Sequence, residues 1–198
     1  MALRITDTFK LRSGHLMPVL GFGVYRAQKA DIKAALEAGY RHLDSAQLYG
    51  NEQECGEVVR ESSLDRKDIF MTTKILRPHA TKEKTIEAID QSLKKIGLGY
   101  VDLMLVHSPM SGAEGRKLLW QALEEVYERG DIKSIGVSNY SVKHLEEMKQ
   151  YAKVLPAVNQ VIDTLWILFY FYFFYFILFI YFFYFIFFFW FLIFWTFQ

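Results

Sequence analysis

The sequence predicts an α/β fold built from parallel strands and crossover helices, and it favours a (β/α)8 (TIM) barrel. Strand-like and helix-like segments alternate five times before a sixth strand, which is typical of an open doubly wound sheet or of a barrel. The run 101–106 is almost continuously apolar, as in a strand buried on both faces. Gly21-Phe22-Gly23 lacks the third glycine of an open dinucleotide fold and begins no helix, which favours the barrel.

The chain is expected to begin with a hairpin. Strands 8–11 and 16–20 flank a turn that contains Gly14. A Gly-rich strand 20–24 follows, and then a helix 31–38 with Asp31 as its cap and Gly39 at its end. The pattern next predicts strand 41–44, a loop through Tyr49-Gly50, helix 52–61 and strand 69–74.

The clearest helix is expected over 81–95. Thr81 is placed to cap it, and its apolar residues recur at helical spacing, at Ile86, Ile89, Leu93 and Ile96. After strand 101–106, the remaining predicted elements are helix 115–128, strand 132–137, helix 141–151 and strand 157–161. The pattern therefore contains a hairpin and about six strands of a barrel that has eight, an incomplete barrel.

The charge, cysteine and histidine content limits the classes of protein that this sequence fits. The 23 Lys and Arg and the 22 Asp and Glu residues all precede Thr164 with signs mixed, which is typical of a solvated enzyme surface and does not indicate nucleic-acid binding. Cys55 is the only cysteine, so no internal disulfide can form, and we expect a reducing, cytoplasmic location. Arg4 and Asp7 fall where a secretory signal needs an apolar run, so no secretory signal is expected. The His residues show no zinc-ligand spacing, so no metal site is expected.

Polar residues fall at the ends of successive predicted strands. They are Asp44, Lys74, His107, Ser138, Asn139 and Gln160, with Tyr49 in the loop after the second strand of the alternation. Each has another explanation when taken alone, such as a turn residue, a packing residue, a solvated cation or a partner for a backbone carbonyl. In a barrel, however, the carboxyl ends of the strands converge on one mouth, so these side chains are candidates for chemistry.

The residue types suit a specific reaction. A phenol titrates near 10 in water, which is too high for efficient proton transfer at neutral pH. A neighbouring ammonium favours the phenolate, and a carboxylate can hold the ammonium in place. Tyr49, Lys74 and Asp44 would form such a relay, and His107 could orient a carbonyl oxygen. A site that protonates a carbonyl oxygen while hydride arrives from elsewhere is a carbonyl reductase.

Five ordered motifs carry a family resemblance. The stretch 41–52 (Arg-His-Leu-Asp-Ser-Ala-Gln-Leu-Tyr-Gly-Asn-Glu) resembles the first signature of the aldo-keto reductase family. The segments 69–74, 101–109, 136–140 and 158–161 also resemble its motifs, in order and at its spacings. The resemblance covers about residues 6–161, and we take 1–163 as a partial domain of this family.

The resemblance implies a (β/α)8 barrel that uses NADPH to reduce small-molecule aldehydes and ketones. On matched positions it makes Tyr49 the proton donor, Lys74 and Asp44 its tuners, and His107 the residue that orients the substrate. It assigns cofactor binding to Gly23, Val24, Asp44, Ser138, Asn139 and Gln160. Tyr25 is either a wall of the substrate pocket or a packing residue.

The resemblance ends after Val161. Where the family continues with a Glu-x-His-Pro type of motif, the chain has Ile162-Asp163-Thr164. The family's later strands carry the ring that stacks on the nicotinamide and the residues that grip the adenosine phosphates. We therefore expect weaker cofactor binding and impaired reduction, or an inactive truncated or mis-spliced fragment.

Residues 164–198 form a low-complexity hydrophobic tail of a different kind. Leu165–Gln198 contains no charge, Gly or Pro and holds 15 Phe and three Trp. Its length satisfies the criterion for a membrane-spanning helix, so membrane association is expected only through this tail. Its Tyr and Trp are spread throughout and no basic residue follows it, unlike ordinary spans. A mis-spliced product, a tail anchor and an aggregation-prone segment all stay open.

Overall fold

The computed structural model describes residues 4–162, and the chain up to Val161 forms one compact unit. The α-helices in this part are α1 Lys29–Glu37, α2 Glu52–Glu61, α3 Lys82–Ile96, α4 Gly112–Glu128 and α5 Val142–Met148. The strands are β1 Thr8–Lys10, β2 Leu16–Pro18, β3 Phe22–Gly23, β4 His42–Asp44, β5 Phe70–Ile75, β6 Leu103–Val106, β7 Ile135–Ser138 and β8 Asn159–Gln160. Two short 3₁₀ helices are η1 Gln47–Tyr49 and η2 Arg66–Asp68.

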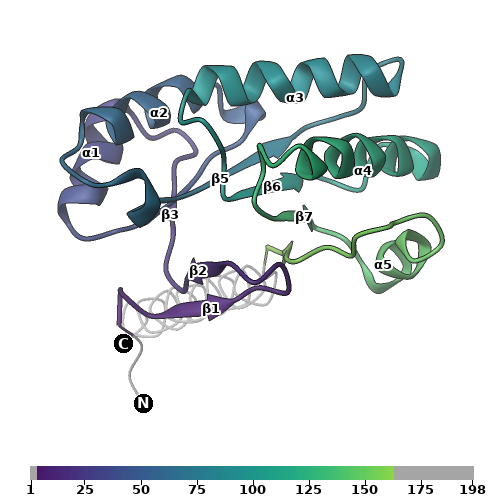
Figure 1. Cartoon of the computed structure of the whole chain (residues 1–198), viewed down its shortest axis with the longest axis horizontal. Helices are drawn as coiled ribbons and strands as arrows, with labels where there is room; N and C mark the ends of the chain where they lie inside the picture. The colour runs from purple at the N-terminus through teal and green to yellow at the C-terminus, as the bar shows by residue number, and fades with distance from the viewer. Residues whose placement is uncertain (1–3, 163–198) are drawn as a thin grey trace, which may run out of the picture. The chain divides into compact units, whose positions relative to one another are not determined.

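The main sheet has the strand order of a barrel. Its order is β3-β4-β5-β6-β7-β8, and every neighbouring pair is parallel. A doubly wound sheet reverses its strand order at a switch point, whereas this order follows the chain without reversal. The predicted fold class, an incomplete (β/α)8 barrel, is confirmed. Figure 1 shows helices α1 to α4 along one side of the strands and the antiparallel β1–β2 hairpin on the other side.

Alternation along β5 separates the two faces of the sheet. Met71 and Ile75 belong to the large core cluster that the sheet forms with the helices. Phe70 belongs to a second, smaller cluster with Leu11 of the hairpin. Because successive strand side chains point to opposite faces, Lys74 shares the face of Phe70. The hairpin residue Leu11 therefore packs on the inner face, the face of the sheet that also carries Lys74.

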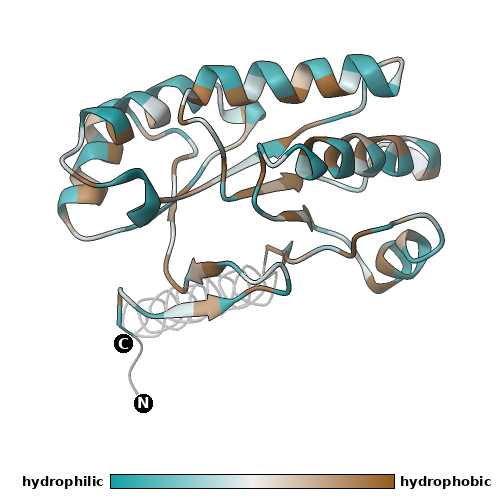
Figure 2. Cartoon of the chain, viewed as in Figure 1, coloured by the Kyte–Doolittle hydropathy of each residue, from teal (hydrophilic) through white to brown (hydrophobic). Residues whose placement is uncertain are grey.

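The hairpin and helix α3 show how local sequence fixes these elements. The Ser13 hydroxyl lies 2.7 Å from that of Ser134, which ties the hairpin turn to the residue before β7. Thr81 caps α3 as predicted, since its Oγ1 accepts from the Lys84 backbone N–H at 3.3 Å. Ile89 on this helix is fully buried, which contributes about 1.5–3 kcal/mol. Figure 2 shows hydrophobic and hydrophilic residues alternating along α3 and α4.

Several element bounds differ from the predicted ones. Asp31 is not the cap of α1: Gln28 is, and Asp31 accepts from the Gln28 backbone N–H at 2.9 Å from inside the first turn. Helix α4 begins at Gly112, three residues before the predicted start. Strand β7 begins at Ile135, because Ile132 makes only an isolated bridge to Val101. Short-range patterns place such ends only to within a few residues.

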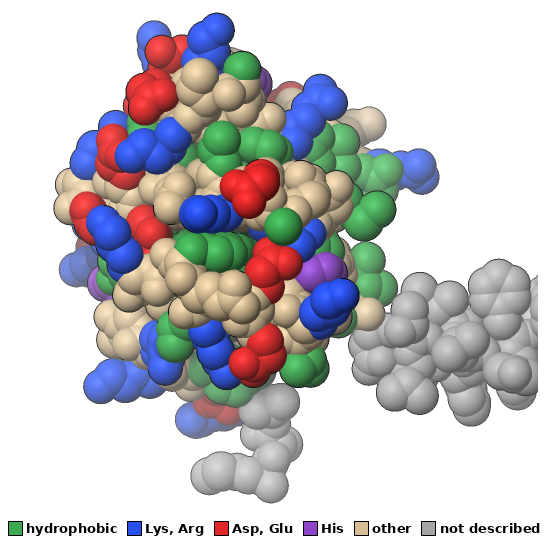
Figure 3. Space-filling view, turned by 90° about the vertical axis from the view of Figure 1, so that its right-hand side faces the viewer, with side chains coloured by type: hydrophobic (Ala, Val, Ile, Leu, Met, Phe, Trp, Pro, Cys, Tyr) green, Lys and Arg blue, Asp and Glu red, His purple; other side chains and the backbone are tan. Residues whose placement is uncertain are grey.

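Charges of both signs mix on the surface. Figure 3 shows Lys and Arg interspersed with Asp and Glu on one face. Two ion pairs join α3 to α4 and its end: Lys82 binds Glu125 at 2.7 Å, and Arg129, directly after α4, binds Asp90. The hydrophobic tail 164–198 and its predicted span lie outside the described residues. Within residues 4–162, no helix combines the length and hydropathy needed to cross a membrane.

Candidate active site

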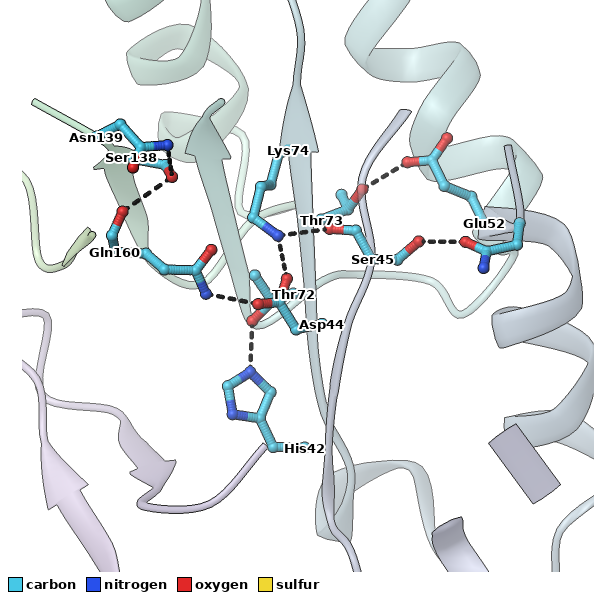
Figure 4. A network of polar contacts seen from close by, with 11 residues as sticks. His42, Asp44, Ser45, Glu52, Thr72, Thr73, Lys74, Ser138, Asn139 and Gln160 are labelled. Atoms are coloured by element: carbon cyan, nitrogen blue, oxygen red, sulfur yellow. Dashed lines mark hydrogen bonds and ion pairs between the residues drawn. The ribbon is translucent and has the colours of Figure 1, made fainter. Parts of the chain in front are cut away.

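A buried ion pair lies on the inner face at the carboxyl ends of β4 and β5. Asp44 ends β4, and Lys74 lies one residue before the end of β5. The Lys74 ammonium binds the Asp44 carboxylate directly and donates to the Ser45 carbonyl at 3.1 Å (Figure 4). The two side chains are 2% and 16% exposed. A charge so far from water persists only when it is paired, so this lysine is held in one place.

Tyr49 lies next to this pair. Its ring centre is 5.1 Å from the Lys74 Nζ. It ends η1, where Gly50 adopts a left-handed φ of 74° that turns the chain into α2. Two residues earlier, the Gln47 side chain donates to the Ala88 carbonyl and accepts from the Leu76 backbone N–H, both at 3.2 Å. The short helix η1, which carries Tyr49, is thus bonded to α3 and to the segment after β5.

His107 follows β6 directly and faces Tyr49. Its backbone N–H donates to the Ile75 carbonyl at 3.0 Å, and its ring meets the Tyr49 ring edge-on at 5.7 Å. Burial lowers the pKa of His107, and the Lys74 charge lowers it further against the opposing effect of Asp44. The imidazole is therefore neutral at neutral pH, and one ring nitrogen can donate to a carbonyl oxygen.

Ser138, Asn139 and Gln160 come together at the ends of β7 and β8. The Ser138 hydroxyl donates to the backbone carbonyl of Gln160 at 2.9 Å. The side-chain amide of Asn139 donates to the Ser138 hydroxyl oxygen at 3.2 Å. The Gln160 side-chain amide donates to Asp44 at 2.5 Å (Figure 4). This last bond joins the two ends of the site across the inner face, so Asp44 binds both Lys74 and Gln160.

The segment 23–25 is only partly at the site. The Tyr25 ring is 5.1 Å from the Tyr49 ring and 57% exposed, so Tyr25 lies at the mouth. Gly23 pairs with Asp44 in the sheet. The Val24 side chain, in contrast, is buried in the core between sheet and helices, and its carbonyl accepts from Asn51 at 2.7 Å. The structure therefore does not bring the Val24 side chain to the site.

Two polar residues that hydrogen-bond β5 beside Lys74 were not predicted from the sequence. Glu52, the first residue of α2, accepts a hydrogen bond from Thr73 at 2.6 Å. His42, on the inner face below Asp44, bonds Thr72 at 2.8 Å. A carboxylate in the first turn of a helix is explained locally by the helix dipole, so the sequence alone gave no signal for the Glu52 contact. Among the described residues no cluster of His, Cys, Asp and Glu could hold a metal ion.

Comparison with known proteins identifies the family to which the sequence is similar. Residues 23–167 match the Aldo/keto reductase family. A glyoxal reductase of Bacillus subtilis is 40% identical over 166 residues, which cover 81% of this chain and 59% of that protein. A 9,11-endoperoxide prostaglandin H2 reductase of Trypanosoma cruzi is 42% identical over 153 residues, covering 73% and 52%. The chain thus spans well under two thirds of these relatives.

Solved structures agree with the fold. An aldo/keto reductase from Brucella melitensis superposes with a TM-score of 0.75 at 41% identity, over 78% of this chain and 62% of that one. A Bombyx mori aldo-keto reductase in complex with NADP gives 0.73 at 27% identity, over 80% and 59%. With a family match over more than half of its residues and such relatives, this chain belongs to the aldo/keto reductase family.

Proposed function

We propose that this protein reduces small aldehydes or ketones to alcohols with NADPH. The observation that carries the proposal is the position of Lys74, which is buried between Asp44 and the ring of Tyr49. A lysine with so little solvent contact is costly to keep, and its place beside a phenol suits proton transfer. The relatives that are named as reductases support the general reaction.

In this proposal Tyr49 donates the proton to the carbonyl oxygen. The phenolate left behind is stabilised by the Lys74 ammonium, and Asp44 keeps that ammonium in position. His107 is neutral because burial and Lys74 lower its pKa, so it orients the carbonyl by a hydrogen bond without adding charge. Tyr25, exposed beside Tyr49, forms a wall for the substrate.

The residues at the ends of β7 and β8 suit a nicotinamide carboxamide. Ser138 offers a hydroxyl, and Asn139 and Gln160 offer amides, which together match the donor and the acceptor of a carboxamide. At Gly23, next to Asp44, an added Cβ would meet nothing within 4 Å, so a ligand can approach there. NADPH, when bound, supplies the hydride; Ser138, Asn139, Gln160, Asp44 and the backbone of Gly23 and Val24 would hold its nicotinamide end.

The proposed function extends to the domain and to the location of the protein. We propose that residues 1–163 act as the oxidoreductase domain and that the protein works in the cytoplasm, in line with a single buried cysteine, Cys55. The weaker cofactor binding expected from the residues after Val161 stays a prediction.

A cofactor titration with the full chain tests the proposal. NADPH fluorescence should change on binding, and loss of NADPH absorbance should follow when a small aromatic aldehyde is added. Gln160→Leu, which removes the amide but keeps the size, should weaken NADPH binding about tenfold, the worth of one hydrogen bond to a ligand. Absence of any NADPH binding at about millimolar cofactor, about −4 kcal/mol, would overturn the proposal.

A further inference from the structure

Glu52 is a buried carboxylate outside the proposed catalytic group. Glu52 is 3% exposed. Its Oε1 accepts hydrogen bonds from the Thr73 hydroxyl at 2.6 Å and from the Ser92 hydroxyl. Ser92 is on α3 and Thr73 is on β5. One carboxylate oxygen at the first residue of α2 thus joins two other elements. Two hydroxyl donors and the helix N-terminus compensate the cost of burying this charge.

Thr73 directly precedes Lys74, and the two side chains leave β5 on opposite faces (Figure 4). Lys74 points inward to Asp44, whereas Thr73 points outward to Glu52. Two neighbouring residues of β5 are therefore held by hydrogen bonds, one on each face of the sheet. A shift of the strand at Thr73 moves the Lys74 backbone with it.

The same carboxylate is close in sequence to Tyr49. Only Gly50 and Asn51 separate the two, and Asn51 is itself fixed because its amide donates to the Val24 carbonyl and accepts from the Ser45 hydroxyl at 3.0 Å. The segment that carries Tyr49 and the strand that carries Lys74 are consequently linked through Glu52 on the outer side of the sheet.

We propose that Glu52 is a positioning residue that sets the place of Lys74 relative to Tyr49 through its bond to Thr73. The proposal rests on the proposed function, because it takes Tyr49 and Lys74 as the reacting pair. It assigns no contact with substrate or cofactor to Glu52. The carboxylate holds β5 and the start of α2 at a fixed spacing, and the lysine side chain, 2% exposed, stays against the phenol.

The test measures how fast an amine-reactive reagent modifies Lys74 in the full chain, with mass spectrometry of the peptide that contains it. Thr73→Val keeps the branched shape and removes the hydroxyl. Loss of a hydrogen bond to a charged group should open the site more often, so labelling of Lys74 should rise about tenfold or more. Thr73→Ser, which restores the hydroxyl, should bring the rate back to the wild-type value.

Thr85→Val is the matched control. Thr85 is also fully buried, and its hydroxyl donates to the Thr81 carbonyl at 2.8 Å and accepts from the His79 backbone N–H at 3.0 Å, none of them site residues. Its Lys74 labelling should match the wild type. If Thr73→Val does not fold, Ser92→Ala removes the other donor to Glu52 and carries the same expectation.

Unchanged labelling in Thr73→Val, or an equal rise in Thr85→Val, would overturn the positioning role. The labelling needs neither cofactor nor substrate, so it decides the role even if the wild type reduces no carbonyl and the proposed function fails. Where the wild type is active, Thr73→Val should lower kcat about tenfold with an unchanged NADPH affinity, and Thr73→Ser should restore kcat.

Discussion

The ammonium of Lys74 lies 5.1 Å from the centre of the Tyr49 ring, although the two residues belong to different elements, β5 and η1. The ammonium also binds Asp44 and is almost completely shielded from water. This placement puts the amino group of Lys74 beside a phenol. In the proposed mechanism, this ammonium stabilises the phenolate that proton donation by Tyr49 would leave.

Replacing Lys74 by Met should destabilise the fold. The change keeps the length of the side chain but leaves the Asp44 carboxylate without its cation, and breaking a buried pair in this way costs about 3–5 kcal/mol. Urea unfolding of the full chain measures the effect. The double variant Lys74→Met with Asp44→Asn should recover part of the loss, because it also removes the unpaired charge. Equal stability of the single and double variants would argue against the pair.

Stability should fall as the solution becomes acidic, starting from about pH 6.5. Burial lowers the pKa of His42 from its ordinary value of 6.5, and Asp44 only partly opposes this shift. The unfolded chain therefore binds more protons than the folded chain below that pH, so the unfolding free energy rises with pH and is lost as pH falls. Burial also lowers the pKa of His107, with the same sign.

The variant His42→Gln isolates this effect. Gln does not titrate and can still bond the Thr72 hydroxyl, the partner of His42 at 2.8 Å. Unfolding free energies measured from neutral pH down to about pH 5 should fall less steeply in His42→Gln than in the wild type. An identical slope in both proteins would assign the acid sensitivity to other groups.

The ion pair between Arg116 on α4 and Glu147 on α5 should couple the two helices. The guanidinium donates to both carboxylate oxygens, at 3.0 and 2.5 Å, and to the Pro109 carbonyl at 2.8 Å. Its side chain is 10% exposed. A double-mutant cycle with Arg116→Met and Glu147→Gln should give a coupling energy of about 0.5–3 kcal/mol. Additive effects of the two changes would contradict a stabilising pair.

Glu147 adds a pH signature to that pair. Its hydrogen bond from Arg116 lowers the pKa of Glu147 below the ordinary 4.5. Its contribution to stability is therefore present above 4.5 and is lost as pH falls through the lower, folded-state value. Arg116→Met should remove this part of the acid dependence.

Gly56 should tolerate no side chain. It lies in α2 against the end of α3, and an added Cβ would come within 1.7 Å of the Ile96 carbonyl oxygen. Gly56→Ala gains up to about 1 kcal/mol from helix propensity, but separating the two helices should cost about 1–3 kcal/mol or more. A net loss of stability in urea unfolding is expected. A more stable variant would show that α2 and α3 do not pack this closely.

The sequence was sufficient for the architecture and for part of the site. Alternation of strands and helices predicts parallel strands, and in such a sheet the carboxyl ends meet at one edge. The proximity of Asp44, Lys74 and His107 follows from that topology. Each ends or directly follows a strand in the sequence pattern, with Lys74 one residue early because β5 continues to Ile75.

The remaining contacts join residues that are far apart in the sequence, and no local sequence pattern indicates them. Gln160 binds Asp44 across 116 residues, and Glu52 binds Ser92 across 40. The orientation of Val24 into the core also depends on the pairing of β3 with β4, which spans only two residues. Such partners are set by packing of the whole sheet, so they had to be read from the structure.

The most direct test of the proposed site compares the wild-type chain with Tyr49→Phe. The change removes one hydroxyl and keeps the ring against His107 and Tyr25. NADPH-dependent reduction of a small aldehyde should fall about 10²–10⁴-fold, the usual contribution of a general acid, while NADPH affinity measured by fluorescence stays the same. Retention of most of the turnover by Tyr49→Phe would contradict proton donation by Tyr49.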